Sequence, residues 1–177
     1  MGRPTRQISA TGEPAGRAAH TCSIVPGRLV GSEAAEALVV FGGVDANGAV
    51  FGDAHALPLL ASGETHPAAW RQLHPAGGPA PSERAVHCAC VLRGGLYVVS
   101  GWAGGQHLLD DMWALTGTSV GGDALWRAPR PYSRAAPAPR EGASLTAIGP
   151  GEAMLFGGNT YVDTHTYIYI HTLYIYI

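Results

Sequence analysis

Lysine is absent from this sequence of 177 residues, so all eleven basic residues are arginines. This absence excludes the lysine of a P-loop and any lysine that forms a Schiff base with a substrate. Charge of either sign is scarce: 14% of the residues are charged, and the formal net charge is −2. Such a chain does not favour a broad surface for nucleic acid or for an anionic membrane. We therefore expect neither as a partner.

Long apolar runs are missing as well. No N-terminal stretch has the features of a signal peptide, and the apolar C-terminal stretch is short and interrupted by Thr and His. The three cysteines, Cys22, Cys88 and Cys90, are odd in number, which favours reduced thiols and a cytoplasmic protein. Glycine and proline, by contrast, are abundant at 25 and 13 residues. They suit short strands joined by tight turns.

The sequence repeats itself at a period that a glycine doublet marks. The second glycine of the doublet recurs after 58 residues and then after 57, at Gly43, Gly101 and Gly158. Gly42 and Gly157 precede the first and the third, but Ser100 precedes the second. We therefore expect that only one of the two positions strictly requires glycine.

Four further landmarks keep register with this doublet. A Pro-x-x-Arg segment lies upstream of each doublet, and a His follows the Arg by three residues in the first two units. A Trp precedes the second and the third of these Arg by 14 residues, and an Asp follows the second glycine by 10 in the first two units. The residues are Arg17, Arg84 and Arg140; His20 and His87; Trp70 and Trp126; Asp53 and Asp111.

The sequence of each complete unit predicts four strands. The first is built of small and β-branched residues, as in "VHCACVL", and a glycine-rich turn joins it to an apolar second strand such as "ALVVF" or "LYVV". Because the second strand is apolar at successive positions, it should be buried on both faces. The third strand carries Asp-x-x-x-Leu, and the fourth carries the Trp. A four-stranded sheet that is covered on both sides and repeats along the chain is a propeller blade.

Together these motifs resemble the kelch repeat, a unit of about 50 residues that builds β-propellers. The resemblance implies an all-β fold, here a partial, open propeller of four-stranded antiparallel blades, because about two and a half units cannot close a ring of four to eight blades. The expected divisions are the end of a preceding blade over 1–16, blade 1 over 17–74, blade 2 over 75–130, an incomplete blade 3 over 131–159 and a tail over 160–177.

Two segments depart from the repeat. The segment "PGRLVGSEAAEA" lengthens the first hairpin, and we expect it to form a longer surface loop. The tail holds five of the seven tyrosines and consists mostly of Tyr, Ile, His and Thr, the residues that alternating TA/CA nucleotide repeats encode. We interpret it as a non-native or disordered low-complexity tail. The alternative is a β-hairpin that completes a blade.

The resemblance also bears on candidate site residues. In similar proteins the repeat arginines contact acidic peptides, so Arg17, Arg84 and Arg140, with His20 and His87, are candidate binding residues. The structural alternative is that each Arg bridges adjacent blades through carbonyl groups or through Asp53 or Asp111. Those two aspartates are otherwise expected to cap turns.

Catalytic and metal sites are weakly indicated. The segment Gly117–Gly121 fits G-x-S-x-G, but a nucleophile elbow needs a helix after its serine, and here another strand is expected. His87 and Cys88 are neighbours on a strand and point to opposite faces, so they cannot easily share a zinc ion. We instead expect the cysteines to be buried small residues.

These patterns predict a non-catalytic scaffold or adaptor that binds a protein partner and needs no cofactor or metal. Contact residues are expected in the loops Val44–Gly48 and Ala103–His107. One alternative is a fragment of a kelch-like propeller enzyme, an oxidase or a hydrolase. Another is a truncated product without an independent function, whose exposed blade edges would invite self-association.

Overall fold

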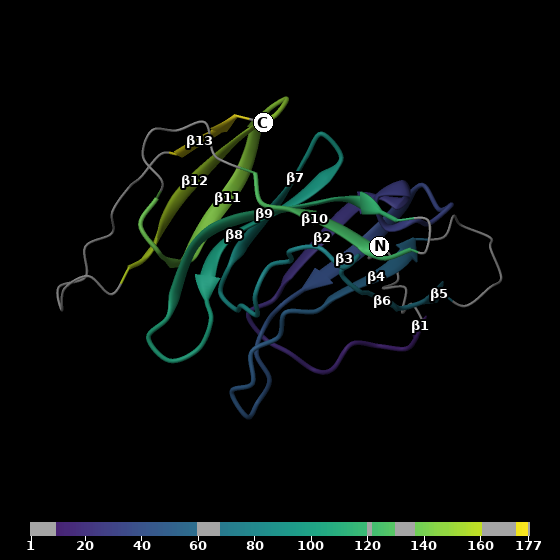
Figure 1. The fold of residues 1–177 in the computed structure, drawn as a ribbon, viewed down its shortest axis with the longest axis horizontal. Helices are drawn as coiled ribbons and strands as arrows, with labels where there is room; N and C mark the ends of the chain where they lie inside the picture. Colours follow the sequence, from purple (N-terminus) through teal and green to yellow (C-terminus); the bar gives the residue numbers. More distant parts are fainter. Residues whose placement is uncertain (1–9, 60–67, 120–121, 130–136, 161–172, 177) are drawn as a thin grey trace, which may run out of the picture.

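The computed structural model describes residues 10–59, 68–119, 122–129 and 137–160, and the backbone of 173–176 (Figure 1). The regular structure of this part of the chain is all strand apart from one short 3-10 helix, and it contains no helix with the length and apolar character of a membrane span. The elements are β1 (Ala10–Thr11), β2 (Thr21–Pro26), η1 (Gly27–Val30), β3 (Glu36–Phe41), β4 (Ala54–Leu59), β5 (Ala68–Ala69), β6 (Arg71–Leu73), β7 (Cys88–Leu92), β8 (Gly95–Trp102), β9 (Leu108–Thr118), β10 (Ala124–Arg127), β11 (Glu141–Gly149), β12 (Glu152–Asn159) and β13 (Leu173–Tyr176).

Two sheets have the four antiparallel strands that the repeat predicts. Blade 1 has the strand order β2-β3-β4-β6, and blade 2 has the order β7-β8-β9-β10. Phe41 of β3 pairs with Thr21 and Ala54, and Val99 of β8 pairs with Cys88 and Met112, which are the same repeat positions. The match confirms the kelch-type blade and the register read from the glycine doublets.

A third sheet, blade 3, has the order β11-β12-β13. Phe156 of β12 pairs with Ser144, the counterpart of Thr21 and Cys88. Leu173–Tyr176, which belongs to the tail, pairs with β12 in the place of a third strand. These four residues thus add a strand to blade 3, as part of the hairpin alternative would, whereas 161–172 and 177 lie outside the described part. The three sheets stand side by side as an open series (Figure 1).

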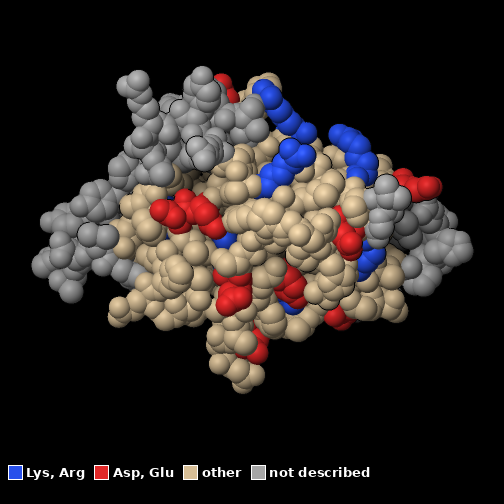
Figure 2. All heavy atoms as spheres, viewed as in Figure 1, with Lys and Arg blue, Asp and Glu red and all other residues tan. Residues whose placement is uncertain are grey.

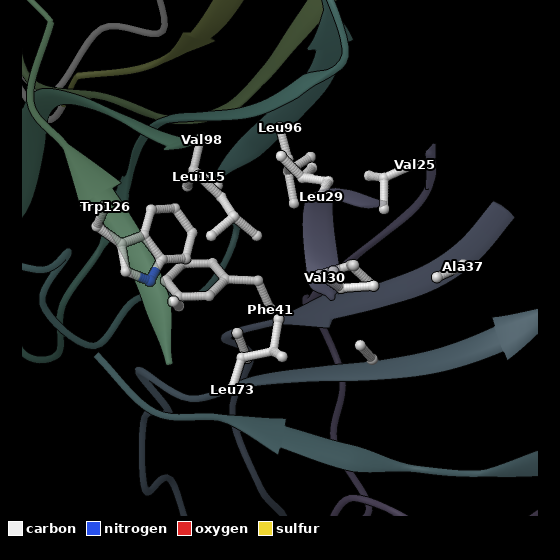
Figure 3. Packing of buried hydrophobic residues seen from close by; sticks show 14 residues of the cluster. Val25, Leu29, Val30, Ala37, Phe41, Leu73, Leu96, Val98, Leu115 and Trp126 are labelled. Atoms are coloured by element: carbon white, nitrogen blue, oxygen red, sulfur yellow. The ribbon is translucent and has the colours of Figure 1, made fainter. Parts of the chain in front are cut away.

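The core lies between successive blades. Phe41 of blade 1 is 1% exposed, and its ring centroid lies 5.3 Å from that of Trp126, on the outer strand of blade 2 (Figure 3). Alternate residues of β8 face opposite ways, because Leu96 and Val98 belong to the cluster shared with blade 1, whereas Tyr97 and Val99 belong to the cluster shared with blade 3. The expected burial of the second strand on both faces is therefore confirmed for blade 2.

The insertion in the first hairpin is not only a surface loop, so that prediction was wrong in part. Its first residues form η1, and Leu29 and Val30 are 5% and 1% exposed within the cluster between blades 1 and 2 (Figure 3). The segment folds back on itself, since the Gly27 N–H donates to the Ala35 carbonyl over 2.9 Å. The apolar pair gains more by filling the widening space between the blades than by remaining in water.

The second position of each doublet has no room for a side chain. A Cβ on Gly101 would lie 2.8 Å from His87 Cβ, and one on Gly158 would lie 2.9 Å from the Glu141 carbonyl oxygen. The first position differs between blades: Ser100 carries a side chain there with φ of 59°, whereas a Cβ on Gly42 would lie 2.4 Å from the Arg84 carbonyl oxygen. A Cβ on Gly157, at the same position of blade 3, would meet nothing within 4 Å. The prediction that one position tolerates a side chain is thus confirmed for blades 2 and 3 but was wrong for blade 1, where neighbouring backbone closes on both glycines.

The start of the described chain follows a repeat pattern as well. Ala10 of β1 pairs in parallel with Ala68, beside the outer strand of blade 1. Pro75, which follows the outer strand of blade 1, forms a parallel bridge to Ala124 of blade 2. Ala68 and Ala124 each stand two residues before the repeat Trp, so the two bridges are equivalent. β1 therefore lies where the exit of a preceding outer strand would lie.

The strictness of the second glycine can be tested by Gly101→Ala against Gly157→Ala. Both changes place an alanine at positive φ, which costs about 1–2 kcal/mol, but only Gly101→Ala adds a clash with Ala85 and His87, just before β7. We expect a loss of about 2–4 kcal/mol for Gly101→Ala and about 1 kcal/mol for Gly157→Ala, measured by urea denaturation with tryptophan fluorescence. Equal losses would contradict the close approach as the cause.

Candidate functional site

The side chain of Arg84, four residues before β7, bonds to the second and third strands of its own blade. It is 0% exposed, and its Nη1 and Nη2 donate to the Asp111 carboxylate over 2.6 and 2.9 Å. Nη1 also donates to the Ser100 carbonyl over 3.1 Å, and Nε to the Ser82 carbonyl over 3.1 Å. Burial would raise the pKa of the Asp111 carboxyl, but the hydrogen bonds and the charge of Arg84 outweigh burial and lower it.

The backbone of Arg84 joins blade 2 to blade 1. Its N–H donates to the Phe51 carbonyl over 2.9 Å, and its carbonyl accepts from the Gly43 N–H over 2.8 Å. One residue thus connects two blades, with its side chain in one and its peptide groups bonded to the other. The geometry favours the structural hypothesis, with the difference that the ion pair lies within a blade and the peptide groups make the bridge.

Arg17 and Arg140 repeat this arrangement with one difference. Arg17 donates to both carboxylate oxygens of Asp53, over 2.5 and 3.1 Å, and its side chain is 4% exposed. Arg140 is 0% exposed and donates to the Gly157 carbonyl over 2.7 Å, but its Nη2 has no hydrogen-bond partner among the described residues. The position that would supply the aspartate holds Ile168, outside the described residues.

The two repeat histidines lie in different environments. His87 is 7% exposed, its Nε2 lies 2.8 Å from Thr21 Oγ1 of blade 1, and its ring packs edge-on against Phe41 with centroids 5.4 Å apart. Burial, with a smaller effect of the Arg84 charge, lowers the pKa of His87 to about 3. His20, at the same repeat position of blade 1, is exposed. The binding role of the three arginines and two histidines stays a prediction.

The cysteines divide in the same way. Cys88 is buried and Cys90 half-buried, and burial raises the pKa of these thiols to about 12 and about 11. The interpretation as buried small residues fits these two. For Cys22 it was wrong: this thiol is exposed, on the side of blade 1 that also exposes His20.

The two loops expected to contact a partner are short and internally bonded. In Val44–Gly48, Asp45 Oδ1 accepts from the N–H groups of Asn47 and Ala49 over 2.9 and 2.8 Å, and these bonds hold the pKa of the carboxyl below its ordinary value. In Ala103–His107, the His107 N–H donates to the Gly104 carbonyl over 3.0 Å. Both loops project at the lower edge of Figure 1. Their exposed residues are Ala46, Asn47, Gly48, Gly105, Gln106 and His107.

Ser119 of the G-x-S-x-G match lies in the turn between β9 and β10. Its N–H donates to the Asp123 carbonyl over 2.8 Å, and its Oγ accepts from the Asp123 N–H over 3.2 Å. A strand follows it, so the environment is that of a turn and not of a nucleophile elbow. Within the described ranges, no three His, Cys, Asp or Glu residues lie close enough together to hold a metal ion.

Arg84 and Arg140 should differ in their contribution to stability, because no described carboxylate pairs with Arg140. Arg84→Met removes one partner of a bidentate pair, and we expect a loss of about 2–3 kcal/mol, below the range for fully buried pairs because the Asp111 side chain is 36% exposed. Arg140→Met removes a buried cation that lacks a full set of acceptors, so its loss should stay below about 1 kcal/mol. Urea denaturation measures both, with exposed Arg127→Met as the control. Equal losses for Arg84→Met and Arg140→Met would contradict this account.

His87 should make the stability depend on pH. The unfolded chain protonates this side chain near pH 6.5 and the folded chain only near pH 3, so its contribution is complete above pH 6.5 and is lost as the pH falls toward 3. We expect the free energy of unfolding to fall by up to about 1.4 kcal/mol per pH unit below pH 6, and by less in His87→Gln. Exposed His107→Gln is the control. Parallel pH profiles of the wild type and His87→Gln would refute it.

Comparison with known proteins agrees with the blade geometry. The KLHDC2/KLHL20/DRC7 Kelch-repeats domain model matches residues 5–176. Adagio protein 3 of Arabidopsis thaliana is 34% identical over 154 residues, which cover 86% of this chain and 22% of that protein. Adagio-like protein 1 of Oryza sativa subsp. japonica is 33% identical over 155 residues, or 86% of this chain and 21% of that protein. The chain thus spans about a fifth of these relatives. With its doublets, arginine bridges and four-stranded blades, it belongs to the kelch-repeat family.

Proposed function

We propose that this chain is a non-catalytic scaffold that binds a protein partner through the loops Val44–Gly48 and Ala103–His107. A role in protein interaction is the general one for kelch-repeat domains. The observation that carries the choice of surface is that both loops project from the same side of the molecule and are held by their own hydrogen bonds (Figure 1). A partner can then bind without paying to order them.

The loops are also held by the blades behind them. The Trp102 Nε1 donates to the Gly105 carbonyl over 2.8 Å, so a side chain from β8 supports the second loop. The first loop leads into Phe51, whose N–H donates to the Gly43 carbonyl and whose carbonyl accepts from Arg84. Rigid strands that carry short exposed loops are the usual arrangement of binding sites on β folds.

The charges near these loops support a neutral or basic partner segment more than an acidic one. The guanidinium groups of Arg17, Arg84 and Arg140 are buried and cannot meet an acidic peptide from solution. Glu83 and Asp110 are exposed, and the lower half of Figure 2, beneath the sheets, carries mainly acidic side chains. An acidic peptide would be repelled there. The free thiols further support placing the protein in the cytoplasm.

The proposal is tested by adding bulk and positive charge to both loops at once. The immobilised chain is incubated with cell extract, and retained proteins are quantified for the wild type, for Ala46→Arg with Gln106→Arg, and for Gln72→Arg with Ala128→Arg. The last pair adds the same charge at exposed positions away from the loops. We expect the loop variant to retain at least about tenfold less of a partner that the control retains, a loss of about 1.4 kcal/mol. Equal retention by both variants would refute the surface.

A further inference from the structure

The two outer blades each expose an apolar face that the repeat buries elsewhere. On blade 1, Ile24 is 55% exposed and Cys22 is exposed, whereas their counterparts in blade 2, Val91 and Ala89, pack against the core cluster of blade 1. We call this side of blade 1, defined by His20, Cys22, Ile24 and Leu38, the leading face.

Blade 3 exposes the opposite side. Phe156 is 46% exposed, whereas Phe41 and Val99 at the same repeat position are each 1% exposed. Ile148 is 45% exposed, whereas its counterpart Leu92 is 4% exposed. We call this side, defined by Ile148, Met154 and Phe156, the trailing face.

The leading face carries the His and the Trp that, at an internal junction, contact the Phe of the preceding blade. At the junction of blades 1 and 2, the ring of Phe41 contacts His87 and Trp126 of the following blade. The equivalents in blade 1 are His20, which is exposed, and Trp70, which is half-buried. Phe156 of one copy could therefore contact His20 and Trp70 of another, as Phe41 contacts His87 and Trp126 within the chain.

The backbone groups of the two faces match as well. At both internal junctions the second glycine of the doublet donates to the repeat Arg carbonyl, as Gly101 does to Arg140 over 2.8 Å. The residue two positions after the Arg then donates back, as Gly142 does to Val86 over 2.8 Å. The equivalent groups on the outer faces are the Gly158 N–H with the Arg17 carbonyl, and the Ala19 N–H with the Gly142 carbonyl.

We propose that two copies of this chain join head to tail, the trailing face of each against the leading face of the other, to form a closed ring of six blades. Three blades from each copy give a number within the four to eight of known propellers. A head-to-tail contact closes when its rotation returns to the start, and the blade-to-blade rotation of a propeller does so. The proposal rests on the blade geometry and is independent of the binding role of the loops.

The experiment measures the mass of the 177-residue chain by size-exclusion chromatography with light scattering. The wild type should have twice the chain mass of 18.3 kDa. Ile24→Asp alone and Phe156→Asp alone should each be monomeric, because each spoils both contacts of a symmetric pair. An equimolar mixture should recover a dimer, because the intact trailing face of Ile24→Asp meets the intact leading face of Phe156→Asp. Leu125→Asp, an exposed apolar position on blade 2, should remain dimeric.

Each other outcome overturns the proposal. A monomeric wild type means that neither face binds a second copy, and a dimer of Ile24→Asp alone means that like faces pair instead. Species larger than a dimer mean that the contact does not close. Alkylation of Cys22 gives an independent readout, since this thiol of the leading face is covered by the trailing face of the second copy only in the dimer. We expect its rate to fall at least about fivefold between dilute and concentrated protein, about 1 kcal/mol of protection, and an unchanged rate would contradict the contact.

Discussion

The whole structure depends on one close contact between segments of the chain. At this contact the glycine doublet lies against the start of the first strand of its own blade and against the repeat Arg segment that opens the next blade. At each internal junction three backbone hydrogen bonds recur at equivalent positions, and they join blade to blade without any side chain. The residue two positions after the repeat Arg then adopts a left-handed backbone conformation: φ is 54° at Ala19, 54° at Val86 and 65° at Gly142. Val86 is β-branched, so this conformation is strained, and the strain persists because both of its peptide groups bond to neighbouring blades.

The same contact explains why the repeat arginines point inward. The Arg lies against the end of the second strand, where the carbonyl of the first doublet position has no strand partner to bond. The Arg84 Nη1 donates to that carbonyl at Ser100, and the Arg140 Nη1 does so at Gly157. In blades 1 and 2 the guanidinium group also reaches an aspartate at the start of the third strand, Asp53 for Arg17 and Asp111 for Arg84. A guanidinium group suits this place because its planar fork reaches several fixed acceptors at once.

The sequence predicted the structure correctly where a physical constraint permits only one residue type. A close backbone approach admits only glycine, so Gly43, Gly101 and Gly158 revealed the register of every blade. It failed where the constraint falls on the backbone alone. Ala19, Val86 and Gly142 share one conformation but no side-chain property, so no pattern could have revealed the left-handed position. Leu29 and Val30 form too short an apolar pair to show a period, and their burial depends on the neighbouring blade.

The outer faces show a further limit of the sequence. Ile24 and Val91 are alike in character and stand at the same repeat position, yet one is exposed and the other packs against a core. Their shared apolar character shows that both positions are suited to packing against a neighbouring blade. Whether such a residue is exposed depends on whether a blade packs against it. Apolar area exposed in this way costs free energy in proportion to its extent, about 25 cal/mol per Å². A chain with two such faces, whose residues stand at the repeat positions of an internal junction, lowers its free energy by bringing them together, and the repeat supplies the geometry in which they meet.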